Sequence, residues 1–374
     1  MEPFKNVFSP ELVACMATHL QQKLPAFDRD AFETPILEQL ETLELKQRAQ
    51  LIADHWHQCL PTDPKQRAEI LLDVLHPDEL DHANQPSDAQ GICGWGVFPL
   101  TMVVGQHGTQ DFVRSMDVLR QMTKRFSSEF GIRYFLLADQ KQALHIMQSW
   151  LNERNYHVRR LISEGSRPRL PWAMQLPALI ADPAPILPLL SHLRDDEHEY
   201  VRRSVANSLN DIAKDHPDLM GKLANDWMKG ANKPRQKLVR HACRTLIKQG
   251  HVATLQAFGI FAPKIKLNKL CVQPAIVQFG EKLEFSCQIQ SICDKPQDLI
   301  VDYILHFKKA NGKLAAKVFK CSKFTLQAKQ TRTLQRQHAI RPISTRRYYQ
   351  GKQALSLRIN GKDFGYQEFD LSMD

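Results

Sequence analysis

The apolar residues follow a helical period through about the first 250 positions of this 374-residue chain, and then change to alternation. Ser9-Pro10-Glu11 and Asp63-Pro64 are helix-start signals, because an N-cap side chain precedes a proline that fits the first turn. A polar connection is expected at 80–95. Helices are expected over about 9–24, 29–59 with Pro35 as a candidate interruption, 63–77, 98–104, 110–126, 128–137 and 140–151.

Three later helices begin alike. Val158-Arg159-Arg160, Val201-Arg202-Arg203 and Val239-Arg240-His241 are spaced 43 and then 38 residues apart. A period near 40 with two helices per unit is typical of HEAT-like repeats. Apolar residues at 201, 205, 209 and 212 form one stripe, and the arginines lie off it. A stack of such helices would present its arginines along one face, which suits a phosphate backbone. The arginines concerned are Arg159, Arg160, Arg202, Arg203, Arg240 and Arg244.

The last 110 residues indicate a β-sandwich. Residues 283–289, 300–307, 355–359 and 369–371 alternate apolar and polar, and Asn311-Gly312 and Asn360-Gly361 are hairpin-turn pairs. About seven short strands predict a sandwich of the immunoglobulin-like kind, although the usual core tryptophan is missing because no tryptophan follows Trp227. We therefore expect an α-then-β chain, with a helical repeat domain at 1–263 and a sandwich at 264–374.

The charge is distributed unevenly. Residues 1–110 hold 7 Lys and Arg against 16 Asp and Glu, residues 111–263 hold 23 against 15, and residues 264–374 hold 20 against 9. Two basic regions after an acidic one favour a polyanionic partner, with an ordinary soluble surface as the alternative. The eight cysteines show no CxxC pairs. No 18-residue apolar run or secretory leader pattern occurs, so we expect a cytoplasmic protein with reduced thiols.

Glu164 breaks a local rule. Gly165 and Pro168 end the helix that begins at Tyr156, so this carboxylate lies in a last turn, where the helix dipole disfavours it. An ion pair with Arg160 is one explanation, and a need for an acceptor at a site is the other. Trp172 follows in an Arg-Pro-Arg-Leu-Pro loop that includes Arg167 and Arg169. It is either a packing residue or a surface for stacking on a base.

Asp211 is the next candidate. It lies with Ser204 and Asn207 on a polar strip beside the apolar stripe, and Asn207 occupies the repeat position of Glu164. Stacked repeats would therefore bring Glu164 and Asp211 close together, whereas Asp211 alone would be an ordinary helix-end acid. Glu129 lies in a first turn, where the dipole favours an acid for structural reasons.

Other constellations are weaker. His55, His57 and Cys59 are residue types that bind metals. On a helix only His55 and Cys59 share a face, and His57 points elsewhere, so a zinc site is not favoured. In the sandwich, residues 341–352 interleave cations and aromatics, including Arg346, Arg347 and Tyr348. This segment is either a nucleic-acid contact or a solvated hairpin.

Four stretches carry a resemblance to a known family: SSEFGIR at 127–133, SEGSRPRLPW at 163–172, VRRSVANSLNDIAKDHPDL at 201–219 and STRRYYQGK at 344–352. The chain resembles, over essentially its full length, the AlkC family of bacterial DNA alkylation-repair glycosylases, in the HEAT-like superfamily that includes AlkD. The resemblance implies a HEAT-like catalytic domain and an immunoglobulin-like domain that clamps DNA. It also implies excision of cationic alkylated bases such as 3-methyladenine and 3-methylcytosine, without full base flipping. The family's active-site residues match Glu129, Glu164, Trp172 and Asp211.

The chemistry agrees with that implication. A base alkylated on a ring nitrogen already carries positive charge, so carboxylates need only stabilise an oxocarbenium-like sugar and position water. We expect no cofactor and no metal, double-stranded DNA as partner, no membrane, and a monomer. Two alternatives are a non-catalytic protein that recognises damaged or branched DNA and a protein-interaction scaffold. The scaffold would lack the salt dependence of phosphate contacts.

Overall fold

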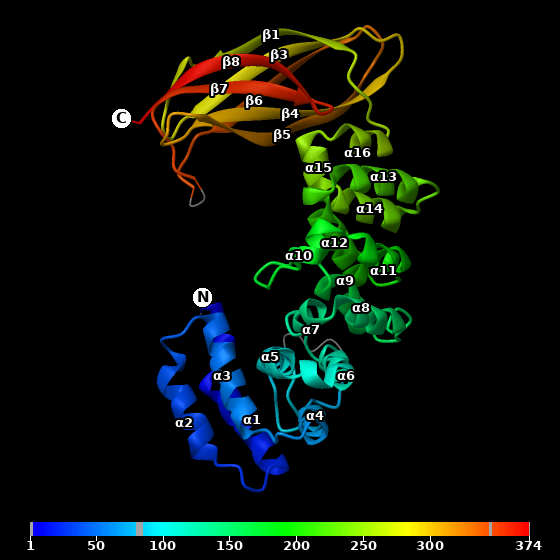
Figure 1. The fold of residues 1–374 in the computed structure, drawn as a ribbon. Coiled ribbons are helices and arrows are strands. Elements are labelled where there is room, and N and C mark those ends of the chain that lie inside the picture. The colour runs from blue at the N-terminus through cyan, green and yellow to red at the C-terminus, as the bar shows by residue number, and fades with distance from the viewer. Residues whose placement is uncertain (1–2, 80–84, 344–345, 374) are drawn as a thin grey trace. The chain divides into compact units, whose positions relative to one another are not determined.

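The computed structural model describes residues 3–79, 85–343 and 346–373. Sixteen α-helices precede eight strands in the described part of the chain, which confirms the predicted order of helices followed by a sandwich (Figure 1). Short 3-10 turns lie at Phe4–Val7, Gly94–Gly96, Thr109–Asp111 and Ala184–Ile186. The helices are α1 (Pro10–Lys23), α2 (Arg29–Leu40), α3 (Leu45–Cys59), α4 (Pro64–Asp73), α5 (Val97–His107), α6 (Phe112–Met122), α7 (Ile132–Ala138), α8 (Gln140–Ser149), α9 (Tyr156–Gly165), α10 (Pro177–Ala181), α11 (Leu187–Leu193), α12 (Glu199–Asp215), α13 (Pro217–Met228), α14 (Lys233–Ala242), α15 (Arg244–Gln249) and α16 (Val252–Ala257).

The helix-start signals act as predicted. The side chains of Ser9 and Asp63 accept hydrogen bonds from backbone amides two to three residues inside α1 and α4. The stretch expected at 29–59 is two helices, but the break is not at Pro35. This proline lies inside α2, and the chain breaks at 41–44, where Glu44 caps α3 with a capping box. Of the connection expected at 80–95, residues 80–84 lie outside the described residues.

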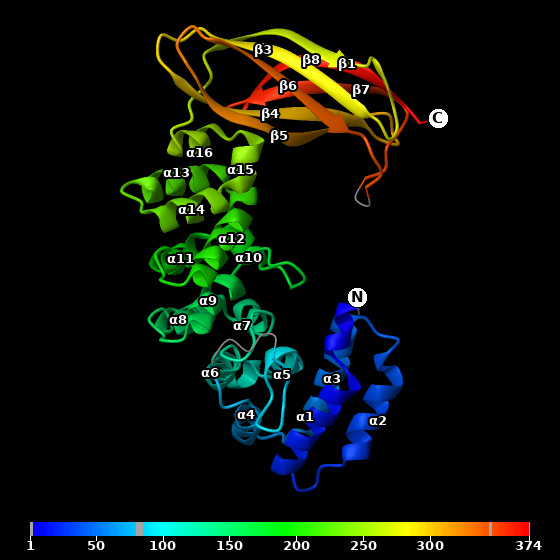
Figure 2. The same ribbon diagram turned by 180° about the vertical axis from the view of Figure 1, so that it is seen from behind.

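The three repeated helices pack together. Helix α12 contacts α9 on one side and α14 on the other, and Val158, Val201 and Val239 are all fully buried. The Ser163 hydroxyl donates to the Ser204 hydroxyl at 2.6 Å between α9 and α12. The Asn210 amide donates to the Ala242 carbonyl at 2.8 Å between α12 and α14. The repeat frame inferred from sequence therefore corresponds to neighbouring helices, as Figure 1 and the view from behind in Figure 2 show.

The strands form two sheets. One has the order β1-β3-β6 and the other β2-β8-β7-β4-β5. The strands are β1 (Ile265–Gln273), β2 (Ile276–Gln278), β3 (Lys282–Ser291), β4 (Gln297–Lys308), β5 (Leu314–Leu326), β6 (Thr331–Ala339), β7 (Gly351–Ile359) and β8 (Lys362–Ser372). The core between the sheets takes alternate residues of β3, including Phe285 and Ile289, together with Val301 and Leu305 of β4. Hairpins join β4 to β5 and β7 to β8 at the two predicted Asn-Gly turns, which confirms those turns.

The described chain divides into two compact units. The first comprises residues 1–215 with 232–242, and the second comprises 216–231 with 243–374. The change from helices to strands falls between Ala257 and Ile265, as the alternation predicts. The second unit nevertheless includes α13, α15 and α16. Gly250, after α15, approaches Gly361 in the β7–β8 turn so closely that a Cβ on Gly250 would lie 2.3 Å from the Gly361 Cα. The separate roles expected for 1–263 and 264–374 stay predictions.

Candidate active site

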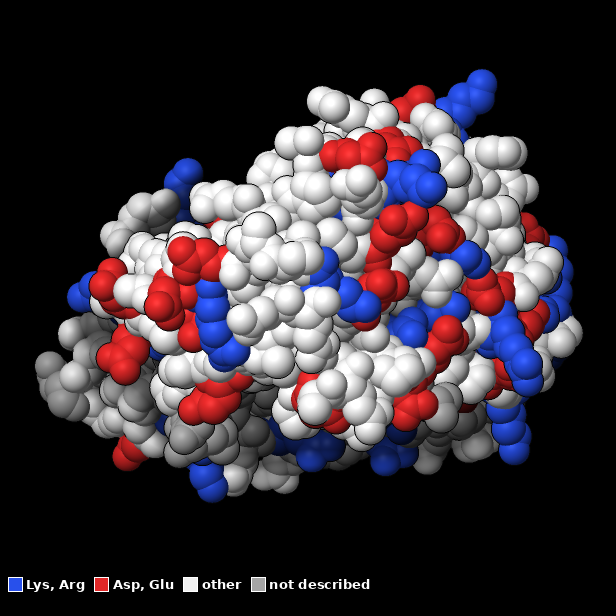
Figure 3. Space-filling view, turned by 90° about the horizontal axis from the view of Figure 1, so that it is seen from below, with Lys and Arg blue, Asp and Glu red and all other residues white. Residues whose placement is uncertain are grey.

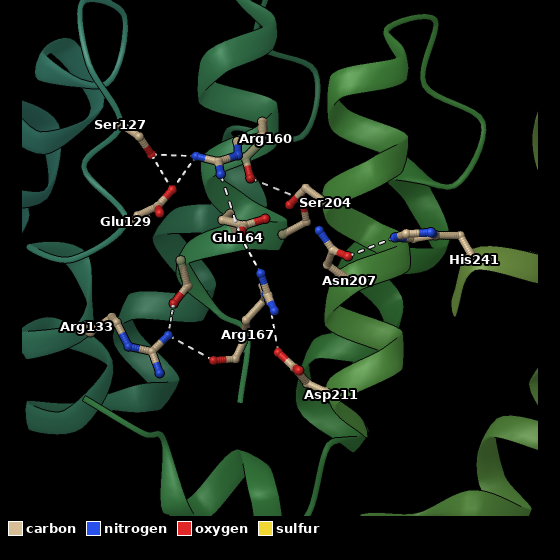
Figure 4. A network of polar contacts seen from close by, with 12 residues as sticks. Ser127, Glu129, Arg133, Arg160, Glu164, Arg167, Ser204, Asn207, Asp211 and His241 are labelled. Carbon is tan, nitrogen blue, oxygen red and sulfur yellow. Dashed lines mark hydrogen bonds and ion pairs between the residues drawn. The ribbon is translucent and has the colours of Figure 1, made fainter. Parts of the chain in front are cut away.

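The candidate site lies in the first unit, where the turn before α7, the end of α9 and the middle of α12 meet (Figure 4). Glu129 comes from the turn, Glu164 from the last turn of α9, and Asp211 from α12. The structure thus brings together three carboxylates separated by up to 82 positions in the sequence. The prediction that stacked repeats place Glu164 near Asp211 is confirmed by the arginine that contacts both.

Glu164 is buried, with 5% of its surface exposed. Its Oε1 lies 2.6 Å from Arg167 Nη1 and 3.5 Å from Arg160 Nη2. Burial raises the pKa of this carboxyl, but the charges of Arg160 and Arg167 and hydrogen bonds from Ser204 and Arg167 outweigh burial, so its pKa lies below the usual value. Glu164 is therefore an anion at neutral pH. The ion pair with Arg160 offered as one explanation is present, with Arg167 as a second partner, and the functional explanation stays a prediction.

Arg167 connects two of the acids. Its Nη1 donates to Glu164, and its Nε donates to Asp211 Oδ2 at 2.9 Å. Asp211 is 2% exposed and also accepts from Lys214 at 3.0 Å. A planar guanidinium with donors on two edges can fix the separation of two carboxylates, which a lysine cannot do. Arg167 therefore sets the geometry of the Glu164–Asp211 pair.

Arg160 connects the third acid, Glu129, to Glu164. Its Nη1 donates to Glu129 Oε2 and, at 2.6 Å, to the Ser127 hydroxyl, which in turn donates to Glu129 at 2.7 Å. Helix α7 begins at Ile132, so Glu129 lies in the turn before it and not in a first helical turn as expected. Its position is held by Arg160 and Ser127 more than by the helix dipole.

Trp172 stands out from the surface. Its backbone has φ = 66°, and 68% of the residue is exposed, so it is not a core packing residue. The ammonium of Lys46 in α3 donates to its carbonyl oxygen. Backbone in this left-handed region is costly for a bulky side chain and is found mostly where surrounding contacts fix it. The indole face is therefore presented at the edge of the site.

A cavity of about 320 Å³ is lined by Trp172 and by two of the carboxylates, Glu129 and Glu164. Its wall is mainly apolar, and Lys46, Ser127, Glu129, Glu164 and Arg167 supply polar groups. The apolar lining consists of Leu45, Trp95, Phe98, Phe126, Phe130, Leu170, Pro171 and Trp172. Aromatic faces beside anions attract planar cations by both ring quadrupole and charge. Sequence patterns did not single out Trp95 and Phe98, because their ring positions depend on packing between α5 and residues 126–130.

Several arginines expected to contact phosphate are engaged within the chain. Arg159 is buried and pairs with Asp196, its Nε lying 2.6 Å from Oδ2. Arg160 and Arg167 hold the carboxylates described above. Arg169 makes two hydrogen bonds to Asp215, and Arg202 donates to the carbonyls of Asp196 and Glu197. A guanidinium that satisfies a buried carboxylate cannot be withdrawn without leaving that charge unpaired. For Arg159, Arg160 and Arg167 the structure thus shows a role in holding helices and acids.

The remaining predicted DNA contacts are exposed or half-buried arginines, except for Tyr348. Arg203 is largely exposed, 3.8 Å from Glu199. Arg240 of α14 and Arg244 of α15 both make interactions within the chain. Arg346 lies over the Phe307 ring, and Arg347 over the Tyr349 ring. Tyr348 belongs to the sandwich core, so its ring packs against Phe279 and Phe307. As DNA contacts, all of these stay predictions.

Sequence reasoning missed one prominent residue. Arg133 of α7 is fully buried and donates to the carbonyls of Gly165, Arg167 and Met174, on the loop that carries Trp172. Its place six residues after Ser127 in the SSEFGIR stretch was a signal, but its burial depends on the approach of α7 to the end of α9. Among the described residues there is no group of three metal-ligating side chains and no helix long and apolar enough to cross a membrane.

The chain is thus a two-part protein, in which a helical region holds a cluster of buried carboxylates and arginines and a two-sheet sandwich follows it. The family model described as "Uncharacterised protein YhaZ, C-terminal Ig-like domain" matches residues 266–373, which confirms the immunoglobulin-like assignment. Uncharacterized protein YhaZ of Bacillus subtilis is 37% identical over 364 residues, which cover 97% of each chain. The structure of Pseudomonas fluorescens alkylpurine DNA glycosylase AlkC, bound to DNA containing an abasic site analog, superposes with a TM-score of 0.83 at 36% identity. That match covers 99% of this chain and 100% of that one. The chain belongs to the AlkC and YhaZ family, as the four sequence stretches predicted.

Proposed function

We propose that this protein is a DNA N-glycosylase that releases cationic alkylated bases from duplex DNA, with 3-methyladenine and 3-methylcytosine as the substrates to test. The observation that carries the proposal is a linked set of three carboxylates, of which Glu129 and Glu164 line an aromatic cavity together with the exposed Trp172, and Asp211 is joined to Glu164 through Arg167. The related AlkC is an alkylpurine DNA glycosylase by its name, and its structure contains DNA with an abasic site analog. That relationship supports the reaction class.

The charge state of the acids fits this reaction. Glu164 has a pKa below the ordinary glutamate value, so it is a poor proton donor at neutral pH. A base alkylated at a ring nitrogen already bears positive charge and needs no general acid to leave. The carboxylates are then available to stabilise the positive charge that develops on the deoxyribose and to orient the attacking water. Glu164, Asp211 and Glu129 are the groups proposed for these roles.

Trp172 is proposed to contact the lesion or its sugar. Attraction between a cation and an indole face contributes about 0.5–2 kcal/mol, depending on desolvation. Its exposure and outward position fit a lesion approached from the groove more than a base enclosed in a tight pocket. The proposal therefore includes excision without full extrusion of the base.

DNA binding is proposed to use exposed and half-buried cations of both units. In the helical unit these include Arg169, Arg202 and Arg203. In the sandwich they include Arg346 and Arg347. The buried Arg159, Arg160 and Arg167 are proposed to act indirectly, by fixing the helices and acids that face the DNA.

The test is a base-release assay on duplexes that each carry one lesion. Wild-type protein should release free base, and Glu164→Gln and Asp211→Asn should each lower the single-turnover rate by about 10²–10³ while DNA affinity stays the same. Glu79→Gln is the matched control, because Glu79 also lies near two cations, 3.0 Å from Lys124 and 3.9 Å from Arg125, but outside the site. It should keep the wild-type rate.

Three outcomes would count against the proposal. Tight, salt-sensitive binding with no base released would indicate a non-catalytic DNA-binding protein. Weak binding with a flat response to salt would indicate a scaffold, because phosphate contacts must show a salt dependence. Full rates in both acid variants would leave the reaction intact but refute the assignment of Glu164 and Asp211.

A further inference from the structure

Arg133 differs from the two arginines that hold the carboxylates. Arg160 and Arg167 donate to carboxylates, whereas the guanidinium of Arg133 donates to backbone carbonyls. The residue is 0% exposed on α7. Nη1 donates to the Gly165 and Arg167 carbonyls, each at 2.8 Å, and Nε donates to the Met174 carbonyl at 2.6 Å. All three acceptors belong to one segment, residues 165–174, which follows Glu164.

This segment has little regular structure of its own. It lies between the end of α9 and the start of α10. Its backbone hydrogen bonds are two turn bonds, from Arg167 to Glu164 and from Ala173 to Leu170, and one bond across the loop, from Leu176 to Pro168. It nevertheless carries Arg167, which fixes two carboxylates, and Trp172, which adopts a positive φ. A loop without a regular hydrogen-bond ladder needs an external anchor to hold such side chains in one geometry.

We infer that Arg133 is a positioning residue for the excision reaction: by clamping the carbonyls of residues 165, 167 and 174, it sets where Arg167 and Trp172 stand relative to the carboxylates. The inference rests on the proposed function, and it assigns to Arg133 no contact with the substrate. The clamp acts at both ends of the loop, since Gly165 closes α9 and Met174 follows Trp172 by two residues. One planar guanidinium, held in place by burial, thereby fixes the span between the acid and the indole.

The chemistry of the clamp is costly for the fold, which favours a role beyond packing. The Nη2 group is buried without a hydrogen-bond partner in the described chain. A buried cation that has no paired carboxylate of its own must be offset by charge-assisted hydrogen bonds to carbonyls. Burial lowers the pKa of Arg133 to about 10, so the guanidinium keeps its proton at neutral pH.

Arg48 provides a matched control. This arginine of α3 is also buried and donates to the carbonyls of Leu43, Lys5 and Phe8, which lie outside the site. Substituting either arginine removes a buried guanidinium that holds backbone. Of the two, only Arg133 holds backbone of the segment that carries Arg167 and Trp172.

The experiment compares Arg133→Ala, Arg133→Lys and Arg48→Ala in the full-length protein. At saturating lesion DNA, both Arg133 variants should lower the single-turnover rate by about tenfold to a hundredfold, the loss typical of a group misplaced by about 1 Å. DNA affinity should change less than about threefold. Free guanidinium, added below denaturing concentrations, should restore a large part of the rate in Arg133→Ala by filling the vacated site, and should not raise the rate of Arg48→Ala. Circular dichroism confirms that each variant is folded.

A second readout does not depend on catalysis. The emission of Trp172, obtained as the difference from the same protein with Trp172→Phe, should shift and become easier to quench with acrylamide in Arg133→Ala, but not in Arg48→Ala. Wild-type rates in the folded Arg133 variants, or an unchanged Trp172 signal, would overturn the inference. If wild-type protein releases no base, the proposed function fails, and the Trp172 signal still decides whether Arg133 positions the loop.

Discussion

At the scale of residues, the same side-chain type serves two purposes in this protein. Arg160 and Arg167 lie among the carboxylates and neutralise them, whereas Arg203 extends into solvent. Sequence spacing shows that arginines recur but not which of them meet a carboxylate from a neighbouring helix. Desolvation decides this, because a buried carboxylate without a cation would be costly enough to lose its charge.

The pKa of Glu164 gives a prediction about stability and pH. Because its pKa in the folded protein lies below the unfolded value of about 4.3, ionised Glu164 stabilises the fold above that pH. This contribution is lost as the pH falls through the folded pKa. We expect Glu164→Gln to lower the free energy of unfolding by about 3–5 kcal/mol at neutral pH, since Arg160 and Arg167 lose a partner.

Urea unfolding at a series of pH values measures this. The difference between wild type and Glu164→Gln should shrink as the pH falls below about 4.3, where the wild-type carboxyl becomes neutral as well. The half-exposed Glu79 is the control, and Glu79→Gln should cost less than about 1 kcal/mol at any pH. A difference for Glu164→Gln that is constant with pH would contradict the ionised state assigned to it.

At the scale of elements, the last turn of α9 is the part of the helix that contributes to the site, because it carries Glu164. Its first turns are fixed by the repeat, with Val158 buried against the neighbouring helices. Its last turn passes close to α7, where a Cβ on Gly165 would lie 2.6 Å from Ile132 Cγ2. The sequence predicts Gly165 as a helix terminator. The structure adds a second reason for glycine there, namely the close approach of α7 and its Arg133.

Gly165→Ala should therefore destabilise the first unit by about 1–3 kcal/mol through overpacking against the fully buried Ile132. Thermal or urea unfolding measures the effect. In a double-mutant cycle, Ile132→Ala should reduce the cost of Gly165→Ala, with a coupling of about 0.5 kcal/mol or more. Strictly additive effects would show that the two side chains do not compete for the same space.

At the scale of the whole molecule, the charges are distributed by sequence region. Acidic and basic side chains are interspersed on the face seen from below in Figure 3. Among the first helices, Lys5 pairs with Glu44 and Lys23 with Asp73. Residues 264–374 hold 20 Lys and Arg against 9 Asp and Glu. Exposed lysines of this region gather on β5, an edge strand of the five-stranded sheet. They are Lys317, Lys320 and Lys323.

Replacing these three lysines by glutamine should weaken DNA binding and reduce its salt dependence. The slope of the logarithm of affinity against the logarithm of salt concentration should fall by about 0.9 for each phosphate that the protein no longer neutralises. Fluorescence anisotropy over a range of salt concentrations measures the slope. Lys5, Lys23 and Lys65, which pair with acids in the first helices, form the control triple and should leave the slope unchanged. An unchanged slope in the β5 variant would exclude this edge from the DNA interface.

The sequence by itself determined the elements and their order. Local chemistry encodes three kinds of feature. They are the helix starts at Ser9 and Asp63, the repeated helices headed by Val158, Val201 and Val239, and the turns at the two Asn-Gly pairs. A cap, a periodic apolar stripe or a positive φ is encoded within a few neighbouring residues. The four candidate catalytic residues also came from the sequence, three of them because their local setting was unusual or repeated and all four through the family resemblance.

Only the tertiary structure decided which charges meet. The pairing of Arg167 with Glu164 and Asp211, the cavity beside Trp172 and the clamp made by Arg133 join segments that are far apart along the chain. Their partners are chosen by how closely helices pack and by the need to satisfy every buried charge, which are properties of the folded state. The position of the break between α2 and α3 was also decided by the structure. Pro35 lies inside α2, and the chain breaks at 41–44, where Glu44 caps α3.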